Sequence, residues 1–244
     1  MKQTKNIIVI FLVSLTLIIA IFSNLTSVNA LPSVDIDELD GNILNNPHIR
    51  YTEQDNLIPH WNMVVTNNIF GGSSVVTGLK ETVNGRRATK ELTGFEVSSS
   101  NQSNEFTSYI SGGKEADGFF LLGQTYSNIT KNKTYIFRTE IRGNARVVMN
   151  IYPGKAVVGQ GVIHTREIQA SNEVQVLEIE FRTELTEITL SFRHMAGSAN
   201  ETFVNIRGAA FIDKESYIKQ QFVKSITEYI NNEEDFIMDS TIES

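Results

Sequence analysis

The sequence predicts an all-β protein: one antiparallel β-sandwich, followed by a C-terminal amphipathic helix. Two observations support this fold class. Between Asn56 and Asp213, apolar and polar residues alternate in short segments that Gly, Asn and Ser clusters separate. After Asp213 the apolar residues recur every three or four positions, which is the period of a helix. Because no helical pattern interrupts the alternating segments, we expect them to form two packed antiparallel sheets.

The clearest strand covers residues 134–142, where Tyr135 and Phe137 point to one face and the residues between them to the other. Gly143-Asn144 separates it from residues 146–152, so these two segments are expected to pair as a hairpin. Further strands are expected at residues 57–65, 106–110, 118–124, 174–183, 187–193 and 203–212.

The C-terminal helix is expected over residues 214–230, with Asp213 as its N-cap. Its apolar stripe consists of Ile218, Phe222, Ile226 and Ile230. An isolated helix of this length is marginal in water, so we expect the stripe to pack on the sandwich of the same chain. The alternative is a protein partner that binds through this helix. The following residues, up to 244, are expected to form a frayed acidic tail, so that helix and tail together cover 214–244.

The first thirty residues resemble a signal peptide. Lys2 and Lys5 precede an apolar run at residues 7–22, and small residues follow up to Ala30. The run is shorter than the roughly 20 residues of a spanning helix, so cleavage is favoured over the alternative of an uncleaved anchor. The sequence therefore predicts a secreted or cell-surface protein, with no membrane partner once the leader is removed.

Composition limits the remaining possibilities. The chain has a formal net charge of −7, which becomes about −9 without Lys2 and Lys5 of the leader. Such a charge speaks against nucleic acid as a partner. Residues 31–55 are polar and acidic and are expected to form a linker or loosely attached arm. The chain has no cysteine, and its Asn-, Ile- and Lys-rich composition is typical of an AT-rich bacterial genome.

No catalytic constellation is found in the sequence. Glu178 and Glu180 alternate along one strand face, as solvated glutamates commonly do, and do not form the cleft pair of a glycosidase. The four histidines lack metal-ligand spacing. The sequence thus predicts no enzyme but an exported binding module. A structural or protein-interaction module of the cell surface is the alternative, and a glycoside-active enzyme is the least favoured class.

Four segments carry a family resemblance: NLIPHWN at residues 56–62, the turn and strand at 124–142, ITLSFR at 188–193, and FVNIRGAAFID at 203–213. Together they resemble the galactose-binding-like jelly-roll domain of extracellular carbohydrate-binding modules. The resemblance covers residues 56–213 and implies a glycan ligand without catalysis. It also implies a structural calcium held by an early and a late acid. Met63 follows Trp61-Asn62 where the early acid is expected, which leaves Asp213 as the one candidate ligand, and no other cofactor is expected.

The sequence places the candidate glycan site on the outer face of the predicted hairpin. Sugars are bound by aromatic rings and by planar polar side chains, and this face carries such residues. An alternative is that Arg138, Glu140 and Arg142 form cross-strand ion pairs on a solvated sheet. Trp61 would then belong to the core. The candidate site residues are Arg138, Glu140, Asn150, Tyr152 and Arg193, with Trp61 at the rim.

Overall fold

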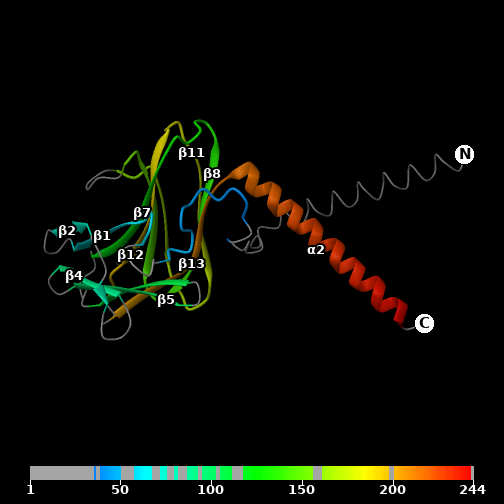
Figure 1. Ribbon diagram of the computed structural model, residues 1–244, viewed down its shortest axis with the longest axis horizontal. Helices are drawn as coiled ribbons and strands as arrows, with labels where there is room; N and C mark the ends of the chain where they lie inside the picture. Colours follow the sequence, from blue (N-terminus) through cyan, green and yellow to red (C-terminus); the bar gives the residue numbers. More distant parts are fainter. Residues whose placement is uncertain are drawn as a thin grey trace, which may run out of the picture. The chain divides into compact units, whose positions relative to one another are not determined.

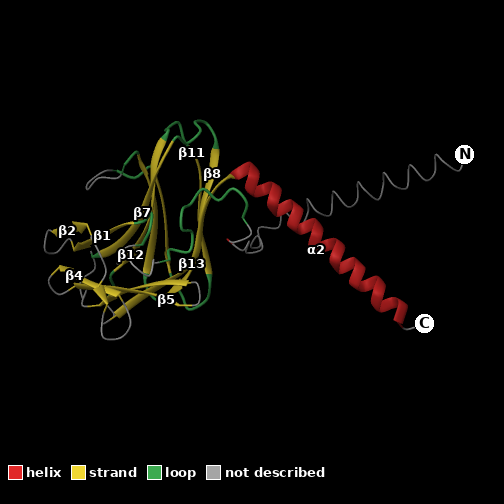
Figure 2. Cartoon of the chain, in the orientation of Figure 1, coloured by secondary structure: helices red, strands yellow, loops and turns green. Residues whose placement is uncertain are grey.

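The computed structural model describes residues 36, 39–50, 58–67, 72–75, 80–81, 87–92, 95–102, 105–111, 118–155, 161–197 and 201–242. The described strands form two antiparallel sheets packed as a sandwich, and one helix follows the last strand (Figure 1 and Figure 2). The predicted fold class is therefore confirmed. The predicted leader, residues 1–30, lies outside the described residues.

The first sheet has six strands in the order β10-β9-β12-β7-β1-β2. They are β10 (His164–Gln169), β9 (Arg146–Pro153), β12 (Glu187–Met195), β7 (Phe119–Ser127), β1 (Asn62–Asn67) and β2 (Gly72–Val75).

The second sheet has seven strands in the order β11-β8-β13-β6-β5-β4-β3. They are β11 (Gln175–Arg182), β8 (Thr134–Gly143), β13 (Glu201–Asp213), β6 (Glu105–Ser111), β5 (Phe95–Gln102), β4 (Arg87–Leu92) and β3 (Lys80–Glu81).

The predicted hairpin between residues 134–142 and 146–152 is wrong. The corresponding strands lie in different sheets: β8 pairs with β11 and β13, whereas β9 pairs with β10 and β12. At Gly143 the chain passes very close to β13, since a Cβ at this position would lie 2.3 Å from the Phe203 carbonyl oxygen. Only glycine allows this approach, and Asn144 N–H then donates to the same carbonyl at 3.1 Å. The turn therefore carries the chain from one sheet to the other.

The core lies between the sheets and is rich in aromatic rings. Phe137 of the seven-stranded sheet packs against Phe192 of the six-stranded sheet, with their centroids 4.9 Å apart. Trp61 packs on the same Phe192 ring at 5.6 Å, is 4% exposed, and donates from Nε1 to the Asn46 carbonyl oxygen. Trp61 is thus a core residue, and its predicted place at the rim of a binding site is wrong.

Within the predicted linker, residues 31–55, the described residues 36 and 39–50 are not loosely attached. Leu44 and Ile49 are buried in the core cluster, and Ile36 covers Gly208 of β13. We call residues 36 and 39–50 the arm. Its backbone bonds to β13 beyond the end of the β6 pairing, where Ile43 N–H donates to the Phe211 carbonyl oxygen at 2.7 Å. Burial of these apolar side chains holds the arm on the sandwich although its composition is acidic. The folded domain therefore begins before residue 56.

Helix α2 (Lys214–Ile242) is longer than predicted, because residues 231–242 continue the helix. Asp213 caps it by accepting a hydrogen bond from Ser216 N–H at 3.0 Å. The predicted docking face is wrong. Tyr217 and Gln221 are buried, whereas Ile218 and Phe222 are 53% and 40% exposed. Within the described ranges, no helix is long and apolar enough to cross a membrane.

Candidate functional site

The outer face of the seven-stranded sheet is divided into a covered and an open part. In the covered part, Ile136, Arg138 and Ile212 are 3% exposed or less, although they alternate with core residues and point away from the core. The arm lies beside β13 here, and the first turns of α2 lie over β8 and β13 (Figure 1). This part of the sheet is closed by the chain itself.

The open part is a groove of about 520 Å³ over strands β6, β13 and β8. Alternate residues of β6 point into it while their neighbours are buried in the core. The groove is lined by Glu105, Thr107, Tyr109, Arg142, Asn172, Phe203 and Asn205. We refer to it as the Tyr109 groove.

Two aromatic rings form the apolar part of the Tyr109 groove. Tyr109 and Phe203 occupy directly paired positions of β6 and β13, and their ring centroids lie 6.4 Å apart at a tilt of 35°. Both side chains are partly exposed. Adjacent rings on a sheet surface provide an apolar area that the flat C–H face of a sugar ring can cover.

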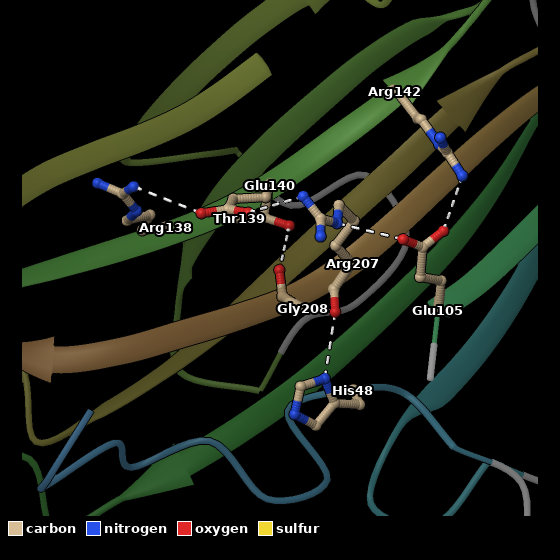
Figure 3. A network of polar contacts seen from close by, with 8 residues as sticks. All are labelled: His48, Glu105, Arg138, Thr139, Glu140, Arg142, Arg207 and Gly208. Carbon is tan, nitrogen blue, oxygen red and sulfur yellow. Dashed lines mark hydrogen bonds and ion pairs between the residues drawn. The ribbon is translucent and has the colours of Figure 1, made fainter. Parts of the chain in front are cut away.

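A chain of charges runs along the groove and into the covered part (Figure 3). Glu105 accepts from Arg142 Nη2 at 2.9 Å and from Arg207 Nε at 3.2 Å. Arg207 Nη1 also lies 3.9 Å from Glu140, which in turn lies 3.7 Å from Arg138 Nη2. Each arginine thus has a carboxylate neighbour, and the network is close to neutral. Arg142 and Arg207 keep nearly half of their side-chain surface in solvent, so their remaining N–H groups can reach a ligand.

Asn205 adds an unused acceptor to the groove. Its Nδ2 donates to Thr107 Oγ1 at 2.9 Å. Its Oδ1 is buried and accepts no hydrogen bond from any described residue. A buried polar atom without a partner is costly, and a ligand hydroxyl would reach this oxygen only if the side chains around it moved.

Two of the predicted site residues, Arg138 and Glu140, belong to the covered part. Arg138 is 2% exposed, and its Nη1 donates to the Tyr217 hydroxyl of α2 at 2.9 Å. Glu178 lies 3.6 Å from the same Nη1. Burial raises the pKa of Glu178, and the charge of Arg138 opposes this shift. Arg138 therefore holds the helix on the sheet and is not accessible to a glycan.

The other three, Asn150, Tyr152 and Arg193, come together on the outer face of the six-stranded sheet. Arg193 donates to the Tyr152 hydroxyl, and its guanidinium lies 4.7 Å from the centroid of the Phe119 ring. Asn150 and Tyr152 are 2% and 4% exposed. The groups of this cluster bind one another, which leaves little surface for a ligand. The predicted composite face does not exist, because its residues lie on two different sheets.

Asp213, the predicted calcium ligand, has other partners. One carboxylate oxygen caps α2, and the other forms an ion pair with Lys133. Among the described residues no three Asp, Glu or His side chains gather closely enough to hold a metal ion. Both carboxylate oxygens of Asp213 thus have partners within the chain, and calcium binding at this residue stays a prediction.

The Tyr109 groove was not predicted, although its residues show a signal in the sequence. Glu105, Thr107 and Tyr109 alternate with Phe106, Ser108 and Ile110, which marks them as one outward face. Phe203 and Asn205 have the same phase in β13. Alternation shows which side chains share a face of a strand but not which strand lies next to it, so the pairing of β6 with β13 could not be derived.

No protein-family model matches the sequence, and no curated protein matches it. Several solved structures share part of the fold. One, described as "CBM4 structure and function", is 10% identical, with a TM-score of 0.43 over 72% of this chain and 99% of its own. A domain of tailspike protein 4 of bacteriophage CBA120 is 10% identical, with a TM-score of 0.43 over 70% of this chain and 21% of its own.

A third similar structure is the extra C-terminal domain of an exo-1,3/1,4-β-glucanase from a Pseudoalteromonas species. It is 9% identical, with a TM-score of 0.42 over 64% of this chain and 88% of its own. Because all three TM-scores lie below 0.5, these similarities assign neither a family nor a ligand to this chain. The galactose-binding-like type stays a prediction.

Proposed function

We propose that this protein is an exported, non-catalytic module that binds a neutral glycan in the Tyr109 groove. The observation that carries the proposal is the combination in one open groove of two neighbouring rings, the half-exposed guanidinium of Arg142 and the carboxylate of Glu105. A sugar ring offers a C–H face for the aromatics and hydroxyls that both donate and accept hydrogen bonds. The groove offers the complement of each.

The charges of the groove favour a neutral ligand. Arg142 and Arg207 share the carboxylate of Glu105, and Arg207 also lies beside Glu140. Since the positive charges are already neutralised, a polyanionic chain would gain little from them and would meet the glutamates. A guanidinium group can donate hydrogen bonds to the hydroxyl groups of a ligand that carries no charge.

The same pairing speaks against the glycosidase alternative. A glycosidase needs two carboxyl groups across a cleft, one of them in surroundings that keep it protonated. Glu105 and Glu140 both lie beside the guanidinium of Arg207, and Glu140 is 8% exposed and does not line the groove, so the two carboxylates do not face each other across it. The non-catalytic role therefore remains the proposal that the groove supports best.

A glycan array, followed by titration calorimetry with the oligosaccharide that binds, tests the proposal. Tyr109→Ala and Arg142→Ala should each weaken binding about tenfold, since each removes a contact of roughly 1–3 kcal/mol. Phe119→Ala is the matched control, because Phe119 is a partly exposed ring on the other sheet. Its affinity should be unchanged. Loss of binding in Phe119→Ala alone would move the site to the Arg193 cluster.

Absence of binding to every neutral glycan would refute the proposal. The alternative of a structural or protein-interaction module would then be favoured. Sustained release of reducing sugar by the purified protein would instead favour the enzyme.

A further inference from the structure

Helix α2 carries a repeat of apolar residues. Phe222-Val223, Tyr229-Ile230 and Phe236-Ile237 are each an aromatic residue followed by a β-branched one, and they recur at intervals of seven residues. Apolar residues that recur every seven positions lie along one side of a helix and can face a second helix along its whole length. We call the side of α2 that carries these three pairs the seam.

The described part of this seam is exposed. Phe222, Val223 and Ile230 keep 40%, 55% and 50% of their surface in solvent, and so does Ile218 one turn earlier, at 53%. The sandwich holds α2 by another side, through Tyr217 and the side chain of Gln220, which donates to the Asp40 carbonyl oxygen at 2.8 Å. Large apolar side chains grouped along one helix in this way mark an interaction surface.

The charges of α2 indicate the partner. Its first half contains Lys214, Lys219 and Lys224 against a single acid, Glu215. Residues 227–244 contain six acids and no basic residue. Acids near the C-terminal end of a helix are unfavourable, because the helix dipole is negative there. A partner that brings positive charge to this end would stabilise it, and the first half of another α2 does so when the two helices are antiparallel.

The sequence of α2 is also symmetric about Tyr229. Phe222 and Phe236 lie seven residues before and after it, and Lys219 and Asp239 lie ten residues before and after it. We propose that two copies of this chain associate through antiparallel α2 helices centred on Tyr229. Each Lys219 then lies beside Asp239 of the second copy, and Phe222 lies beside Phe236 of the second copy.

Sedimentation equilibrium of the chain from Leu31 tests the association. We expect a dimer, and Val223→Glu and Ile230→Glu should each raise its dissociation constant at least tenfold, since each places an acid in the seam. Leu185→Glu is the matched control: Leu185 is 37% exposed but lies in the loop between β11 and β12, and its substitution should leave the dimer unchanged. A monomer at all concentrations, or an equal effect of Leu185→Glu, would overturn the proposal.

Introduced cysteines test the orientation, because the chain has none of its own. Tyr229→Cys should form a disulfide-linked dimer in air. Lys219→Cys should remain reduced, since the two thiols of an antiparallel pair are roughly 30 Å apart. Disulfide formation at both positions shows a parallel pair, and any pattern other than Tyr229→Cys alone overturns the antiparallel arrangement. In addition, Lys219→Glu should weaken the dimer, and Asp239→Lys in the same chain should restore it.

This association is independent of glycan binding, because the Tyr109 groove shares no residue with α2. Tyr109→Ala should therefore leave the dimer unchanged.

Discussion

Acidification should destabilise this protein through one buried histidine. His194 points into the space between the sheets, where Nδ1 lies 2.9 Å from Ser108 Oγ and Nε2 lies 3.0 Å from Thr202 Oγ1. Burial lowers the pKa of His194 to about 3. In the unfolded chain the ring binds a proton near pH 6.5, whereas in the folded protein it stays neutral. The free energy of unfolding therefore falls by about 1.4 kcal/mol for each pH unit below 6.5, until the pKa of the folded state is reached.

From pH 7 to pH 5 the loss should amount to about 2 kcal/mol. Urea denaturation at these two pH values measures it. His194→Gln keeps hydrogen-bonding groups at the site but removes the titrating ring. The free energy of unfolding of this variant should therefore be the same at pH 7 and pH 5. The control variant His164→Gln should show the same pH dependence as the unmodified protein. The measurement stops at pH 5 because the pKa of Glu178 is raised in the folded protein. As the pH falls through that pKa, protonation of Glu178 increases the free energy of unfolding and so opposes the effect of His194. Equal stability of the unmodified protein at pH 7 and pH 5 would refute the reasoning.

Three further substitutions test the described contacts by urea denaturation. Tyr217→Phe should lower the free energy of unfolding by about 1.5–3 kcal/mol, because it removes a hydrogen bond to the buried charge of Arg138. Leu185→Ala, in the exposed loop between β11 and β12, should change it by less than ~0.5 kcal/mol. Gly143→Ala should lower the free energy of unfolding by about 1–3 kcal/mol, because the added Cβ would meet the Phe203 carbonyl oxygen. Gly161→Ala is the control, because no atom lies near the position of its Cβ, and its free energy of unfolding should be unchanged. Leu44→Ala should cost about 2–5 kcal/mol, as in any core, and an unchanged stability would show that the arm is loose.

The sequence was informative where a pattern depends on local chemistry. Alternation in β8 and β12 correctly separated inward from outward side chains, since the side chain period of a strand is fixed by its backbone. The change of period after Asp213 correctly marked the start of α2, and the carboxylate of Asp213 caps it as expected. These features need no knowledge of distant parts of the chain.

The pairing of strands could not be predicted, because it depends on residues far apart in the sequence. Gly143-Asn144 has the composition of a hairpin turn, but here it carries the chain between sheets. The predicted pairing of β8 with β9 placed five candidate site residues on one face. In the structure they lie on two different sheets. The apolar stripe of α2 was equally misleading, because amphipathicity shows that a face needs a partner but does not name the partner. A single tyrosine beside that stripe, Tyr217, binds the sheet instead.

The pairing of the arm with β13 has a consequence for the order of folding. Residues near 43 and 211 are hydrogen-bonded neighbours, so the two ends of the domain must both be present before this edge can close. A chain still under synthesis has the arm but lacks β13. The apolar residues of the arm therefore cannot yet be buried against this strand. Such long-range pairing makes folding slow and delays it until the last strand has been made.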